Sequence, residues 1–223
     1  MNIGIQFFGG RGAGSGGPSL GGSGGGNNVN IIDTEDMLSY RKRNDSTMEF
    51  GEQTMTGVAQ VYDDFPDIGV EQVQAAKLGG KDNVEVLGYY DGKNVAINQN
   101  YTDTAKMNGA YDRAVQSGFH PSRGDKSGAE AVALHEMGHA LTDHIGKKMG
   151  ASGIDDASQK IVEQAYKNAK GRGGTKAWAK EISGYATHSF AECVAEAVAD
   201  YYCNGSKANK NSLAVMAVIN NYK

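Results

Sequence analysis

The segment that decides the fold of this chain is His135-Glu136-Met137-Gly138-His139. Residues four apart on an α-helix lie on the same face, one turn apart, so His135 and His139 would project together. Two imidazoles at that spacing can bind one Zn²⁺ through ring nitrogens at about 2.0–2.1 Å. Glu136 would lie beside the ion, where its carboxylate can hold a metal-activated water and take its proton. The segment therefore predicts a zinc site with a general base next to it.

The sequence around this segment favours a helix over about residues 127–146. Ser127 and Glu130 fit a capping box, in which the serine hydroxyl accepts from an early amide and the glutamate reaches back. Apolar residues recur behind the cap at helical spacing, as Leu134, Met137, Leu141 and Ile145. We expect this stripe to face the core, with the two histidines on the opposite side of the helix.

A catalytic zinc site needs a third protein ligand and an open position. No histidine follows His139 at the spacing of a metzincin, since His144 is only five residues further on and would point elsewhere. A later helical stretch supplies Glu192, Glu196 and Asp200 at steps of four. Three carboxylates on one face of an otherwise apolar helix are costly unless something positive pairs with them. One of them would bind zinc, and the one a turn later would orient a ligand histidine.

Two further stretches carry a family resemblance. They are Ser183-Gly184-Tyr185-Ala186 and Glu192-Cys193-Val194-Ala195-Glu196-Ala197. Together with the His-Glu-x-x-His segment they resemble the gluzincin clan, and more narrowly the compact gluzincins related to the anthrax lethal factor catalytic domain. Domains of that group occur in bacterial toxins and in phage or prophage proteins. The resemblance covers about residues 84–203.

The resemblance implies a role for each matching residue. In that group a tyrosine lies seven residues before the glutamate ligand and an acidic residue lies four after it, as Tyr185, Glu192 and Glu196 do here. The resemblance implies that Glu192 binds zinc and that Glu196 supports His135. It also implies that Tyr185 donates a hydrogen bond to the tetrahedral oxyanion, with Glu136 as the general base.

Alternatives stay open for the acidic helix and for two histidines. Glu196 could be the zinc ligand with Asp200 as its supporter, as in thermolysin-like helices. Glu192 would then only complete a capping box with the serine three residues before it. His120 and His188 are typical of loop histidines, although His188 could also assist at the oxyanion.

We expect an α+β fold of the zincin type, a small and mostly antiparallel sheet with the zinc helix and the glutamate helix behind it. The sheet signal is a hairpin over residues 84–98, where Asp91-Gly92 separates alternating apolar runs. That dipeptide predicts a tight turn whose two central positions need positive φ. The hairpin resembles the edge strand that pairs with extended peptide substrates in gluzincins. The other predicted helices cover about residues 33–43, 52–65, 103–117, 155–170, 187–203 and 209–221, with a short one near Trp178, and residues 70–78 fit helix or strand.

Length, charge and cysteine content limit the class of protein. The chain has 223 residues and a net charge of −4, with no basic stripe of the kind that binds nucleic acid. Two cysteines are too few for a disulfide scaffold, and we see neither a membrane-length apolar run nor a secretory signal. Residues 1–30 are glycine-rich and predict a disordered tail ahead of one domain over residues 31–223, with a catalytic core at about 84–203. We expect a protein of the bacterial cytoplasm or the virion.

These observations predict a zinc-dependent endopeptidase whose partner is a peptide or protein substrate, with neither nucleic acid nor membrane as a partner. Another class stays open, a phage or mobile-element structural or accessory protein that uses a zincin fold for binding. Its glycine-rich tail would contact phage structural proteins. A toxin-type metallopeptidase effector is a third possibility.

Overall fold

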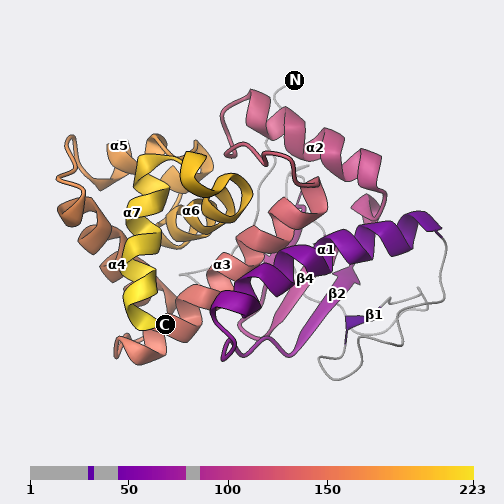
Figure 1. Cartoon of the computed structure of the whole chain (residues 1–223), viewed down its shortest axis with the longest axis horizontal. Helices are drawn as coiled ribbons and strands as arrows, with labels where there is room; N and C mark the ends of the chain where they lie inside the picture. The colour runs from indigo at the N-terminus through magenta and orange to yellow at the C-terminus, as the bar shows by residue number, and fades with distance from the viewer. Residues whose placement is uncertain (1–29, 33–44, 79–85) are drawn as a thin grey trace.

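The computed structural model describes residues 30–32, 45–78 and 86–223. The predicted glycine-rich tail, apart from its last residue, and the predicted helix over residues 33–43 lie outside the described residues. What is described is an α+β fold in which helices dominate (Figure 1). The sheet lies at one end of the molecule and α4 to α7 at the other, with α3 running between them.

Most helices lie within a few residues of their predicted ranges. They are α1 (Asp45–Asp64), α2 (Thr104–Gln116), α3 (Gly128–Lys148), α4 (Ile154–Asn168), α5 (Thr175–Lys180), α6 (Phe190–Asn204) and α7 (Lys210–Ile219). α1 begins several residues earlier than expected. The stretch that fitted either helix or strand contains strand β2 (Gln72–Ala76).

The sheet has the strand order β1-β2-β4-β3, with β1 at Asn30–Ile32, β3 at Gly88–Tyr90 and β4 at Asn94–Asn98. β1 pairs antiparallel with β2, and β3 pairs antiparallel with β4, as the predicted hairpin requires. The central pairing between β2 and β4 is parallel, so the sheet is mixed. β3 runs opposite to β2, and the hairpin reverses the chain once more, so β4 runs in the same direction as β2.

The hairpin turn differs from the expected one. Gly92 has a φ of 99°, but Asp91 is not among the described residues with positive φ. The Asp91 carboxylate instead accepts from the amides of Lys93 and Asn94, at 2.9 and 2.7 Å. Asp91 therefore closes a three-residue turn with its side chain, as aspartate does in Asx turns.

α3 lies at the centre of the fold, and it is buried on both sides rather than along one apolar stripe. Leu134 and Leu141 are fully buried, and so is His139. α6 approaches α3 closely because Gly138 has no side chain, since a Cβ there would lie 2.8 Å from the Cα of Ala195. This contact brings the acidic helix against the histidine side of α3.

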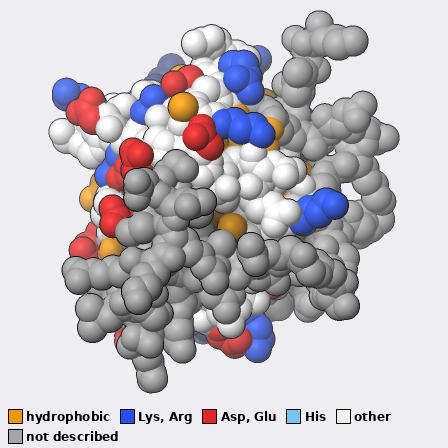
Figure 2. All heavy atoms as spheres, turned by 90° about the vertical axis from the view of Figure 1, so that its right-hand side faces the viewer, with side chains coloured by type: hydrophobic (Ala, Val, Ile, Leu, Met, Phe, Trp, Pro, Cys, Tyr) orange, Lys and Arg blue, Asp and Glu red, His pale blue; other side chains and the backbone are white. Residues whose placement is uncertain are grey.

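Figure 2 shows the sheet end of the molecule, where basic and acidic side chains of the described residues are interspersed. Within residues 45–78 and 86–223, no helix combines the length and the apolar character that crossing a membrane requires.

Candidate metal centre

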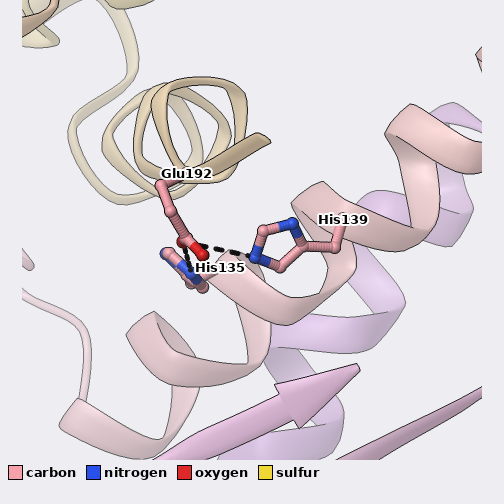
Figure 3. A group of neighbouring side chains, drawn as sticks. All are labelled: His135, His139 and Glu192. Carbon is pink, nitrogen blue, oxygen red and sulfur yellow. Dashed lines mark ion pairs between the residues drawn. The ribbon is translucent and has the colours of Figure 1, made fainter. Parts of the chain in front are cut away.

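Three side chains from α3 and α6 converge in the interior (Figure 3). Oε2 of Glu192 lies 3.1 Å from Nε2 of His135 and 3.4 Å from Nε2 of His139. One ligand atom from each residue lies within 4.8 Å of the other two, and all three residues are buried. The group could therefore hold a metal ion.

The first turn of α6 directs Glu192 into this group. Ser189 caps the helix, because its hydroxyl accepts from the Glu192 amide at 3.1 Å. The alternative explanation for Glu192 was a capping box, and the structure contains only its serine half. The Glu192 carboxylate, however, points toward the two histidines (Figure 3). One residue thus serves the cap through its backbone and the candidate metal centre through its side chain.

Glu196 follows one turn later and orients His135. Its Oε1 lies 2.8 Å from Nδ1 of His135. A carboxylate can only accept, so Nδ1 carries a proton, and Nε2, the nitrogen that faces Glu192, is the one that could bind a metal ion once its own proton is displaced. Asp200, the supporter in the alternative assignment, lies elsewhere and accepts from Asn204 and Asn209 at 2.8 Å each. The carboxylates near the histidines are therefore those of Glu192 and Glu196, whereas Asp200 is hydrogen-bonded to the two asparagines.

Glu136 lies beside the group in a different environment. It is fully buried, and neither of its carboxylate oxygens has a hydrogen-bond partner among the described residues. Burial raises the pKa of Glu136 to about 8, an effect that His135 opposes and that Glu192 and Glu196 reinforce. Glu136 faces the edge strand, since a Cβ on Gly88 would lie 2.6 Å from its Oε1.

Tyr185 reaches the candidate metal centre from the short 3₁₀ helix η3 (Tyr185–Thr187). It is buried, and its ring centroid lies 5.9 Å from that of His135. Burial raises the pKa of Tyr185, and the neighbouring carboxylates raise it further, including Glu192, with which the hydroxyl forms a hydrogen bond. The hydroxyl is therefore protonated and lies next to a candidate ligand.

Sequence reasoning missed two partners of Glu196. His120 lies in a loop, as expected, but it is buried there with Nδ1 at 3.0 Å from Oε1 of Glu196. Ser183 donates its hydroxyl proton to Oε2 of Glu196 at 2.7 Å. Ser183 did stand in the stretch that carries the family resemblance, whereas no local signal pointed to His120. His188 is exposed, and its ring centroid lies 4.9 Å from that of Tyr185.

The electrostatics of the group fit a cation. Burial opposes a charge on His135, yet its hydrogen bonds to Glu192 and Glu196 raise its pKa to about 10. Burial likewise opposes the charge of Glu192, but the two histidines lower its pKa. A metal ion competes with protons for such ligands. Two imidazole nitrogens and one carboxylate suit Zn²⁺, although other divalent transition metals accept the same donors.

The chain matches no protein-family model, no curated protein and no solved structure in comparisons with each.

Proposed function

We propose that the protein is a zinc-dependent endopeptidase with a zincin-like fold of the compact gluzincin type. One observation carries the proposal. A buried His135–His139–Glu192 group lies next to Glu136, whose carboxylate has no hydrogen-bond partner among the described residues. A metal site that served structure alone would gain nothing from such a carboxylate, because burying an unpaired one is costly.

Each residue of the group has a role in peptide hydrolysis under this proposal. His135, His139 and Glu192 would hold Zn²⁺, which when bound polarises a carbonyl and lowers the pKa of water. Glu136 accepts a proton from the attacking water and passes it to the leaving amine. Tyr185, whose hydroxyl is protonated and bonded to Glu192, donates to the developing oxyanion.

The sheet supplies a place for an extended substrate. Among the described strands, β3 is last in the order and pairs on one side with β4, and its Gly88 lies directly against Glu136. An extended peptide can add to such an edge through main-chain hydrogen bonds. A peptide bound along β3 would run past Glu136, which supports a peptide or protein as the substrate.

Burial of the group favours a second candidate, a binding protein. His135 and His139 are at most 1% exposed and Glu136 is fully buried. Shielding from solvent suits a zinc site with a structural role, whereas the three ligands of the group, one fewer than a structural site has, suit a catalytic one. The corresponding function is that of a phage structural or accessory protein whose zinc site stabilises a binding fold. A toxin-type effector would share the peptidase chemistry with the first candidate.

Glu136→Gln separates the two candidates. A general base contributes about 10²–10⁴-fold to the rate, so the variant should bind stoichiometric zinc and cleave peptides at least a hundredfold more slowly than wild type. The measurement is zinc content together with turnover on a peptide library, followed by sequencing of new N-termini in bacterial extract. Glu163→Gln, on the exposed side of α4, is the matched control. A zinc-loaded wild type that cleaves nothing, or equal turnover by the variant, would contradict the peptidase proposal.

A further inference from the structure

Glu196 accepts hydrogen bonds from three separate segments of the chain. His135 on α3 and His120 in the loop after α2 both approach Oε1, at 2.8 and 3.0 Å. His120 also lies 3.1 Å from Oε2, which accepts from Ser183 at 2.7 Å. An ionised carboxylate offers about four lone-pair sites, so these donors occupy most of them. The orientation of Glu196 is thus set by His120 and Ser183 as well as by His135.

Backbone hydrogen bonds hold the loop that carries His120 in the position from which His120 reaches Glu196. The amides of Gly184 and Tyr185 donate to the carbonyls of Gly118 and Phe119, at 2.8 and 3.0 Å. The His120 ring stacks on Tyr111, with centroids 5.4 Å apart, and its side chain is fully buried. Packing therefore holds the ring in one orientation, with Nδ1 toward Glu196. Since a carboxylate only accepts, that nitrogen carries a proton.

We propose that His120 is a positioning residue of the metal centre. Its Nδ1–H holds Glu196 in the orientation in which Oε1 accepts from His135. That hydrogen bond places a proton of His135 on Nδ1, so Nε2 would be the nitrogen that binds a metal ion. This inference rests on the proposed metal centre and assigns a role to a residue more than a dozen positions before the His-Glu-x-x-His segment.

The same network connects the ligand helix with the tyrosine. Ser183 donates to Glu196 and accepts from the amide of Ala186 at 3.0 Å, so it fixes the turn that presents Tyr185. His120 lies against Tyr185, with ring centroids 5.5 Å apart. Replacement of His120 by a side chain without a donor would leave Glu196 free to turn toward Ser183. The hydrogen bond that orients His135 would then weaken.

Zinc affinity and a Co²⁺ spectrum test the proposal without any activity measurement. His120→Leu keeps the volume and removes the donor, and we expect it to lower zinc affinity in chelator competition by about tenfold or more, the range found when groups behind metal-bound histidines are lost. The absorption bands of the Co²⁺-loaded variant should shift. His120→Asn places an amide nitrogen near the position of Nδ1 and should restore affinity and spectrum. Wild-type affinity and an unchanged Co²⁺ spectrum in folded His120→Leu would overturn the proposal.

A second pair of variants decides the matter if His120→Leu does not fold. His120→Gln carries its amide nitrogen near the position of Nε2, one bond too far from Glu196, so it should bind zinc more weakly than His120→Asn. Equal zinc affinity of the two amide variants would overturn the proposal. Failure of the proposed peptidase function would look different, because a wild type that binds zinc and cleaves nothing would still show these differences in affinity.

Discussion

The candidate metal centre has two sides of opposite character. The α6 wall carries Glu192 and Glu196, and the β3 wall is the side where Glu136 of α3 lies against Gly88 of β3. On the α6 wall, the carboxylates of Glu192 and Glu196 lie within 3.1 Å of His135 nitrogens. On the β3 wall, Glu136 faces the bare backbone of Gly88 and has no hydrogen-bond partner among the described residues. The carboxylates of the α6 wall are held in place by the histidines, whereas the Glu136 carboxylate is available to accept a proton.

The difference affects the acidity of the three carboxylates. Histidines around Glu192 and Glu196 lower their pKa values despite burial, whereas burial raises the pKa of Glu136 to about 8. Carboxylates that stay ionised suit the binding of a cation, and one that titrates near neutral pH suits proton transfer. The α6 wall should therefore control metal content, and the β3 wall should control turnover.

The largest expected effect is the loss of bound zinc when Glu192, the candidate ligand on the α6 wall, is removed. Glu192→Ala removes one of three donors and should abolish stoichiometric zinc, measured by metal analysis after dialysis. Glu196→Ala should retain zinc with an affinity about 10–100-fold lower, because it acts through His135. Asp200→Ala should leave zinc affinity unchanged. Zinc that remains in Glu192→Ala and disappears in Glu196→Ala would assign the ligand to Glu196.

An intermediate effect is expected from the β3 wall. Gly88→Ala would place a methyl group 2.6 Å from Oε1 of Glu136, and also 2.8 Å from Val132. Displacement of a catalytic group by about 1 Å can cost roughly 10²-fold, so kcat/KM should fall by about that factor while zinc content stays constant. The control is Gly69→Ala, where nothing lies within 4 Å of the added atom. Wild-type turnover in Gly88→Ala would contradict the expectation that the β3 wall controls turnover.

The smallest effect should lie outside both walls, in the loop that carries His120. Arg123 in this loop pairs with Asp112 of α2 at 2.7 Å, and its hydrogen bond lowers the pKa of Asp112 below the ordinary value of 3.8. The stabilisation is complete above that value and is lost as the pH falls below it. Because the pair is partly exposed, Asp112→Asn should cost less than about 1 kcal/mol in urea unfolding at pH 7. The difference from wild type should shrink at pH 3, and a constant difference would exclude the ion pair as its cause.

Local signals predicted the helical part of the candidate centre. Both halves of the capping box at Ser127 and Glu130 are present, and α3 begins where that box predicts. The step of four between Glu192 and Glu196 was enough to expect two carboxylates on one side of a helix. Helix caps and periodicity depend on neighbours within a few residues, so the sequence contains them directly.

The remainder depends on contacts between distant residues. His120 and Glu196 are 76 positions apart, and nothing in the loop sequence indicates their pairing. The parallel pairing of β2 with β4 arises from the path of the chain through the hairpin. The sequence of either strand alone does not indicate which strand it pairs with or in which direction. Burial of α3 on both sides follows from the packing of α6, and periodicity within α3 alone indicated only one buried stripe.

The close approach at Gly138 has a consequence for the His-Glu-x-x-His pattern itself. Its two middle positions are commonly written as if any residue fits them. Here the second one sets the separation of two helices, since any Cβ would meet the backbone of Ala195 at 2.8 Å. Glu192 lies less than one turn before Ala195, so a side chain at position 138 would move Glu192 away from the histidines. A residue with no side chain thus sets the distance between Glu192 and the two histidines of the candidate metal centre.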